Sequence, residues 1–301
     1  MKQSRREFIK TSALALSAVS LSNTSLFSMG AAKPKLGIQL YTVRKAMEKN
    51  PLETLKAIAS IGYKYVEHAK YSERKFYGYA PKEFKKILAD LGMKMPSGHT
   101  RIEKRHWDAA KKDFTAEWKY TIEDAATAGQ EYVISPSMEE SIYASESTLK
   151  QFLDVFNKCG ELCQKSGMKF GYHNHDFEFE KLLNNRSVYD IIMTSTDPKL
   201  VAQQLDTGNL FNGGAKAIDI IKKYPKRFEL MHVKDEVEVP LGHAKFESTV
   251  LGVGVAQVKE VIDLGAAGGV KYMIVEQESY HGKDPIDCAR EDYQAMKNWG
   301  Y

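Results

Sequence analysis

Short apolar runs alternate with longer amphipathic segments along most of the chain. The short runs are rich in Val, Ile, Tyr and Phe, which is typical of buried β-strands, and they begin about 27 to 43 residues apart. The longer segments carry apolar residues at helical spacing, and several end in a glycine just before the next short run. The predicted strands begin at Lys35, Tyr65, Lys94, Glu131, Lys169, Val201, Phe228 and Lys271, and the clearest predicted helices are 52–61, 81–91, 148–167, 215–224 and 255–264.

Eight strand-then-helix units of this size predict a single-domain (β/α)8 TIM barrel in the α/β class, spanning residues 33–301. A doubly wound open sheet is the alternative. The Gly-rich dinucleotide fingerprint does not follow the first strand, which favours the barrel. Residues 237–253 follow the seventh strand and are long for a connection, so we expect an irregular lid or binding loop there, on the active-site face.

The first 32 residues have the order of a cleaved export signal. Ser-Arg-Arg-Glu-Phe-Ile-Lys at 4–10 precedes an apolar run at 13–21, and small residues follow at 30–32. The adjacent arginines resemble a twin-arginine signal, which predicts a periplasmic or otherwise exported protein. An ordinary secretory signal and a membrane anchor are the alternatives. The apolar run is short and rich in serine, so we expect no stable membrane span in the mature protein.

Composition excludes several classes of protein. Of the 301 residues, 43% are hydrophobic and 27% are charged, which is typical of a soluble globular chain. The net charge is +4. Residues 1–32 contribute +3 of it, from Lys2, Arg5, Arg6 and Lys10 against Glu7. The remainder has no basic excess for binding nucleic acid. The three cysteines are too few for a disulfide framework and are expected to be buried thiols.

Ionisable residues follow the apolar runs at four successive predicted strands. These residues are His173, Asp206, His232 and Glu276. Because barrel enzymes work at the carboxyl ends of their strands, we expect the four side chains to converge. Two imidazoles and two carboxylates form a competent set of ligands for a divalent metal. Each residue alone has an ordinary alternative, such as a hydrogen-bonded histidine, a turn at Asp206 or an ion pair at Glu276.

Four motifs in order are similar to those of the xylose isomerase-like sugar phosphate isomerase/epimerase superfamily. They are YHNHDFEF at 172–179, DTGN at 206–209, HVKD at 232–235 and VEQE at 275–278, and the resemblance covers residues 35–300. The resemblance implies a TIM barrel with a bound divalent metal, for which Mn, Co, Fe and Zn are the candidates. Its ligands would include Asp206, His232 and Glu276. The strand-five ligand is commonly Glu in this superfamily, but here the position holds His173, with His175 as the competing choice.

This departure bears on the expected mechanism. In the ketose epimerases of the superfamily, two metal-bound glutamates exchange a proton on opposite faces of a carbon beside a carbonyl. Only Glu276 remains of that pair here, and it is the expected base. His175 or His99 could serve as the second acid or base, because imidazoles titrate near neutral pH. Lys234 could stabilise a developing oxyanion, or it could pair with the acidic residues that follow it.

The predicted activity is therefore that of a metal-dependent sugar isomerase or epimerase that abstracts a proton next to a carbonyl. A lyase or dehydratase acting on a 3-keto-glycoside or inosose is the alternative, and it would use the same abstraction without a second base. A carbohydrate-binding barrel without activity is a third hypothesis. An apurinic endonuclease is a fourth, which the near-neutral mature chain and the export signal oppose.

Export also narrows the substrate. Sugar phosphates are cytoplasmic, so we expect an unphosphorylated sugar or keto sugar as the small-molecule partner. Pairing into a homo-oligomer is common in such barrels. The candidate substrate contacts are Glu67, Glu178, Trp107 and His281, and Tyr41, Phe177 and Tyr280 are further aromatic candidates for stacking on a sugar ring, although core packing is the ordinary role of such residues.

Overall fold

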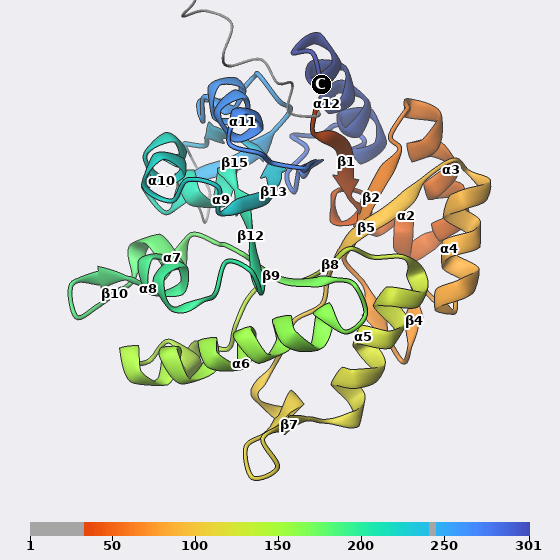
Figure 1. The fold of residues 1–301 in the computed structure, drawn as a ribbon. Coiled ribbons are helices and arrows are strands. Elements are labelled where there is room, and N and C mark those ends of the chain that lie inside the picture. The colour runs from red at the N-terminus through yellow and green to blue at the C-terminus, as the bar shows by residue number, and fades with distance from the viewer. Residues whose placement is uncertain (1–32, 241–244) are drawn as a thin grey trace, which may run out of the picture. The chain divides into compact units, whose positions relative to one another are not determined.

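Eight parallel strands close into a barrel in this computed structural model, which describes residues 33–240 and 245–301. Neighbouring strands follow the chain order (Figure 1), and the last strand, β16, pairs with the first. The predicted TIM barrel and its eight strands are confirmed. The strands are β1 (Lys35–Gln39), β2 (Tyr65–His68), β5 (Lys94–His99), β8 (Tyr132–Ser135), β9 (Lys169–His173), β12 (Val201–Asp206), β13 (Phe228–Val233) and β16 (Tyr272–Val275).

Helices connect the strands and cover the outside of the barrel. Several stop at the glycines expected to end them, and Gly62 and Gly129 adopt the positive φ angles (124° and 91°) that favour glycine. The α-helices are α2 (Arg44–Lys49), α3 (Pro51–Ile61), α4 (Pro81–Asp90), α5 (Ala116–Ala128), α6 (Glu146–Gln164), α7 (Phe177–Glu180), α8 (Val188–Ser195), α9 (Thr207–Asn212), α10 (Ala217–Lys223), α11 (Val258–Ala267) and α12 (Pro285–Asn298). The 3-10 helices are η1 (Leu40–Val43), η2 (Lys104–His106) and η3 (Glu140–Ile142).

Four antiparallel hairpins decorate the loops. They pair β3 (Tyr71–Ser72) with β4 (Lys75–Phe76), β6 (Trp107–Asp108) with β7 (Asp113–Phe114), β10 (Leu182–Leu183) with β11 (Arg186–Ser187), and β14 (Asp235–Glu238) with β15 (Phe246–Thr249). The last pair corrects the expectation of an irregular loop over 237–253. The backbone N–H and C=O groups of the two strands bond to one another in an antiparallel ladder. In an irregular loop these groups would have to bond to water instead.

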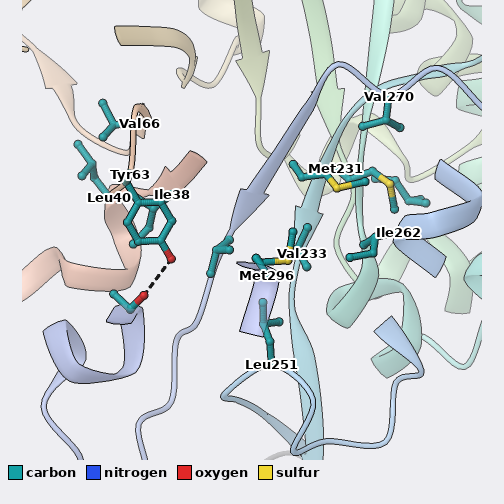
Figure 2. Packing of buried hydrophobic residues seen from close by; sticks show 14 of the residues in the cluster. Ile38, Leu40, Tyr63, Val66, Met231, Val233, Leu251, Ile262, Val270 and Met296 are labelled. Carbon is teal, nitrogen blue, oxygen red and sulfur yellow. Dashed lines mark hydrogen bonds between the residues drawn. The ribbon is translucent and has the colours of Figure 1, made fainter. Parts of the chain in front are cut away.

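The main hydrophobic core lies between the strands and the helices. Figure 2 shows part of it, where Met231 and Val233 of β13 pack near Ile262 of α11. On the other side of the view, the buried Tyr63 hydroxyl donates a hydrogen bond to the Ala289 carbonyl at 2.9 Å, which joins the start of β2 to α12. The three cysteines, all within the described ranges, are buried free thiols as predicted.

The inside of the barrel changes character along its axis. Alternate residues of a strand share one face, so Ala202, Gln204 and Asp206 of β12 point the same way. Ala202 packs in an inner apolar cluster with Leu230 of β13, toward the amino ends of the strands. Two residues further along β13 the same face carries His232, which lies beside Asp206 in register. The barrel therefore has an apolar amino end and an ionisable carboxyl end.

Two expectations fall partly or wholly outside the described residues. The export signal, its cleavage and the boundary at residue 33 concern residues 1–32, which the structure does not describe. Among the helices that are described, none is both long enough and apolar enough to cross a membrane.

Candidate functional site

The carboxyl ends of the last four strands bring together the residues predicted to bind a metal. His173, Asp206, His232 and Glu276 each offer a ligand atom, and these four atoms lie within 4.8 Å of one another. All four side chains are buried. Asp206 Oδ2 lies 3.7 Å from both His173 Nε2 and His232 Nδ1, and Glu276 Oε2 lies 3.1 Å from His232 Nδ1.

This group has the chemistry and the geometry of a divalent-metal site. Nitrogen and oxygen ligands of this kind suit Mn, Co, Fe and Zn, and two carboxylates balance a 2+ charge. Asp206 Oδ2 is buried and makes no well-aligned hydrogen bond within the described part of the chain, although the Lys234 ammonium lies 3.1 Å away. A buried carboxylate oxygen needs a positive partner, and a metal ion would supply one. The competing residue His175 is not in the group, so the geometry favours His173 as the fourth ligand.

A buried hydrogen-bond network orients both imidazoles. Glu67 Oε1 lies 2.6 Å from His232 Nε2, and Gln204 Oε1 lies 3.1 Å from His173 Nδ1. Carboxylate and amide oxygens only accept, so both ring nitrogens must carry the hydrogen. The opposite nitrogens, His232 Nδ1 and His173 Nε2, are then left facing Asp206. The Glu67 carboxylate is fixed in turn by Gln39 at 2.7 Å and by Gln204 at 2.8 Å.

The charges of this cluster are strongly coupled. Burial alone would lower the pKa of His232, but Glu276 and Glu67 hold that pKa well above its usual range. Burial would raise the pKa of Glu276, yet the charges of Lys234 and His232 hold it well below. Burial lowers the pKa of His173, and the neighbouring imidazolium of His232 adds to this effect. The site thus holds ionised carboxylates where a cation would bind.

His175 lies at the edge of the group formed by His173, Asp206, His232 and Glu276, which is called the metal-ligand group below. Its ring is 5.1 Å from that of His173, and its buried Nδ1 has no hydrogen-bond partner among the described residues. Its backbone N–H donates to Glu178 Oε2 at 2.8 Å, and Tyr172 donates its hydroxyl to the other oxygen of the same carboxyl. Burial raises the pKa of Glu178 to about 8 and, with the charge of Lys234, lowers that of His175.

A cavity of about 850 Å³ opens from the metal-ligand group. His99, His173, His175 and Glu276 line its inner end. Its outer walls come from the first half of the β3–β4 hairpin (71–74), from residues between 100 and 106 that follow β5, and from the first part of α5. A volume of this size accommodates a ligand larger than one sugar ring. Tyr41 lines the cavity as well, in agreement with its place among the aromatic candidates.

A family model for the xylose isomerase-like TIM barrel matches residues 55–299. The chain belongs to this family. The chain is 35% identical over 101 residues to an inosose dehydratase of Clostridium beijerinckii, covering 34% of this chain and 33% of that protein. It is 29% identical over 157 residues to the inosose dehydratase of Geobacillus thermodenitrificans, covering 48% and 52%. The chain therefore spans about a third to a half of the length of these curated relatives.

Solved structures of similar fold cover nearly the whole chain. A sugar phosphate isomerase/epimerase from Parabacteroides distasonis has a TM-score of 0.72 at 23% identity, covering 90% of this chain and 95% of that one. The IolI protein with a bound zinc atom has a TM-score of 0.67 at 16% identity, covering 88% and 97%. A probable 3-DHS dehydratase, AsbF from Bacillus anthracis, has a TM-score of 0.67 at 12% identity, covering 88% and 99%. At these identities the likeness concerns the fold.

The four residues predicted to contact the substrate do not line this cavity. Glu67 has no exposed surface and accepts a hydrogen bond from His232 Nε2, as described above. Glu178 is equally buried behind His175. Trp107 packs edge-on against Phe114 in its own hairpin, with ring centres 4.9 Å apart. His281 lines a separate, smaller cavity beside the β14–β15 hairpin and lies 3.1 Å from the Ser248 carbonyl.

Lys234 contacts neither of the two acidic neighbours that follow it. Its ammonium lies instead 2.6 Å from Glu278 Oε1, 2.8 Å from Glu276 Oε2 and 3.1 Å from Asp206 Oδ2. Gln39, Gln204 and Glu278 were not predicted as site residues. For Gln204 a signal existed, because it lies two residues before Asp206 and therefore on the same face of its strand.

Proposed function

We propose that this protein is a metal-dependent lyase or dehydratase that removes a proton beside the carbonyl of an unphosphorylated keto sugar or keto cyclitol. The observation that carries the proposal is the convergence of His173, Asp206, His232 and Glu276 at the inner end of a cavity that His175 also lines. The similarity to inosose dehydratases supports elimination over isomerisation as the outcome.

The chain's own residues suit one-sided proton transfer. A divalent metal held by the four ligands would act as a Lewis acid toward the carbonyl oxygen. His175 lies outside the ligand set with an unshared ring nitrogen, so it can take the proton from the carbon beside the carbonyl. The C–O bond at the next carbon then breaks as the C=C bond forms. The leaving hydroxyl takes the proton that His175 carries and departs as water, so one imidazole serves both steps.

The loop after the seventh strand supports an unphosphorylated substrate. In many TIM barrels the amide groups after strands seven and eight bind phosphate. Here the Asp235 carboxylate already accepts hydrogen bonds from the backbone amides of Gly252 (2.9 Å), Gly254 (3.1 Å) and Ala256 (3.2 Å). These amides are therefore not available to a phosphate group. The prediction of an exported protein, which remains a prediction, agrees with a substrate of this kind.

Isomerisation or epimerisation is the second candidate, because the Parabacteroides structure of similar fold is a sugar phosphate isomerase/epimerase. It needs a proton returned to carbon instead of a lost hydroxyl. Glu276 and His99 both line the cavity and could return it.

Incubation of the metal-loaded protein with an inosose and with a 3-keto-glucoside in heavy water tests the proposal. We expect loss of water or of the substituent, detected as a mass decrease, and at least a hundredfold lower rate for His175→Gln, since general acid–base catalysis supplies about that factor. His281→Gln is the matched control and should leave the rate unchanged. Deuterium uptake with no loss of mass would favour the isomerase. No exchange with any keto sugar would contradict both enzymes and favour a binding barrel.

A further inference from the structure

Lys234 places a buried ammonium group inside the metal-ligand cluster. The side chain is 1% exposed and its Nζ lies within 3.1 Å of the carboxylates of Asp206, Glu276 and Glu278. Its backbone is fixed, because its N–H donates to the Thr207 hydroxyl at 3.0 Å and that hydroxyl donates to its carbonyl at 2.8 Å. Any movement of Lys234 is therefore confined to its side chain.

The oxygens that Lys234 contacts are those a metal would need. Nζ lies 3.1 Å from Asp206 Oδ2 and 2.8 Å from Glu276 Oε2. The same two oxygens face one ring nitrogen of His232, Nδ1, at 3.7 Å and 3.1 Å. An ammonium group and a divalent ion would both sit within contact distance of these oxygens. Two cations so close repel strongly in a buried site.

Glu278 offers Lys234 a second position. Its side chain is 43% exposed, it lines the cavity, and it is not among the four metal-ligand residues. Asn209 Oδ1, also on the cavity wall, lies 3.3 Å from the ammonium nitrogen. A small rotation of the lysine side chain toward these two groups would keep its charge paired while releasing Asp206 and Glu276.

On the basis of the proposed function, we propose that Lys234 is a resident cation that competes with the divalent metal for Asp206 and Glu276. When the metal binds, the ammonium moves to Glu278 at the cavity wall. Metal loading and the position of Lys234 are then coupled, and the loaded site presents an ammonium donor to the substrate.

Metal affinity tests this competition without any substrate. Metal-stripped protein is titrated with Mn²⁺ and with Zn²⁺ by calorimetry, for wild type, Lys234→Met and Lys234→Gln. We expect both variants to bind about tenfold or more tightly than wild type, because a like charge has been removed. Lys271→Met is the matched control, since Lys271 pairs with Glu229 at the opposite end of the barrel, and its affinity should equal that of wild type. Unchanged or weaker binding by the two Lys234 variants would overturn the competition.

The role of Glu278 has its own test. Glu278→Gln removes the second position for the ammonium, so we expect metal affinity to fall several-fold, whereas an unchanged affinity would overturn that part of the proposal. Crystals of the wild-type protein grown with Mn²⁺ and with a chelator give a direct measurement. The Nζ to Asp206 Oδ2 distance should lengthen beyond hydrogen-bonding range with Mn²⁺, and an unchanged distance would contradict the movement.

The outcomes also separate the two proposals. Tighter metal binding by the Lys234 variants, with no reaction on any keto sugar, would support the competition between Lys234 and the metal but contradict the proposed enzymatic activity. If the wild type and every variant bind no metal, both are rejected.

Discussion

Glu67 orients the ring of His232, one of the proposed metal ligands. It has no exposed surface, and its oxygens lie 2.6 Å from His232 Nε2 and 3.0 Å from His99 Nε2. Burial would raise the pKa of this carboxyl, but the charges of those two imidazoles hold it well below its usual range. An ionised carboxylate behind a histidine fixes the tautomer and makes the imidazole a better ligand. Glu67 is therefore best understood as a positioning residue.

Replacing Glu67 by Gln should weaken divalent-metal binding by roughly 10- to 100-fold, because a neutral amide orients His232 less strongly. Calorimetric titration of metal-stripped protein measures the effect. Glu178→Gln is the matched control, since Glu178 is just as buried but contacts His175 and Tyr172 in place of a metal ligand. Equal losses of affinity in the two variants would contradict the orienting role of Glu67.

At the scale of elements, α12 holds the loop that follows the β14–β15 hairpin. Asp292 of α12 is 1% exposed, and one of its oxygens accepts a hydrogen bond from the Leu251 amide at 2.9 Å. Its other oxygen has no partner within the described ranges. Burial raises the pKa of this carboxyl to about 8, and the negative charges of Glu291 and Asp235 add to the rise.

Asp292 should make stability depend on pH. Its folded-state pKa lies above the unfolded value, so its stabilising contribution is complete below about pH 4 and is lost as the pH rises through about 8. From pH 5 to 8 the wild type should lose, relative to Asp292→Asn, on the order of a few kcal/mol of unfolding free energy. Urea denaturation across that range measures it.

Asp287→Asn is the control on the same helix, because its side chain is 67% exposed. This variant should follow the wild-type pH dependence. Parallel curves for wild type and Asp292→Asn would contradict the proposed protonation of Asp292 in the folded protein.

At the scale of the whole barrel, the two ends have different tasks. The four residues that could hold a metal occupy the carboxyl end, whereas a network around Glu229 closes the amino end. Glu229 forms ion pairs with Lys169 and Lys271, and the Lys271 pair measures 2.7 Å. Glu229 also accepts a hydrogen bond from the Tyr132 hydroxyl at 2.9 Å. Tyr132 belongs to the inner apolar cluster, so this network covers the bottom of the barrel core.

Glu229→Gln should lower the free energy of unfolding by about 1 kcal/mol, because it leaves the half-buried Lys169 and the more exposed Lys271 without their carboxylate. Denaturant unfolding measures the loss. The metal affinity of this variant should equal that of wild type, since the apolar layer separates the two ends. A comparable fall in metal affinity would show that the ends are coupled and would contradict this division.

Much of the fold was predictable because strands and helices have different sequence periods. All eight strands were found from their apolar runs, and the glycines that end α3, α4, α5 and α6 marked several helix ends. The β14–β15 hairpin was not predicted, because its pairing joins segments that carry no strong alternation. The short β3–β4 and β6–β7 hairpins were missed for the same reason, with only two residues in each strand.

The order of the amino acids already shows which residue types stand at the ends of the strands, and a barrel of parallel strands makes such ends meet. His173, Asp206, His232 and Glu276 could therefore be grouped in advance as metal ligands, a prediction that metal binding has yet to test. The partners of Lys234 could be identified only in the folded protein, because distances between different strands depend on register and side-chain rotamer. The same holds for the face on which each residue of β2 lies. Glu67 points into the barrel, whereas His68 packs outward against Phe76 and needs Gly98 beside it, since an added Cβ there would lie 1.9 Å from its ring.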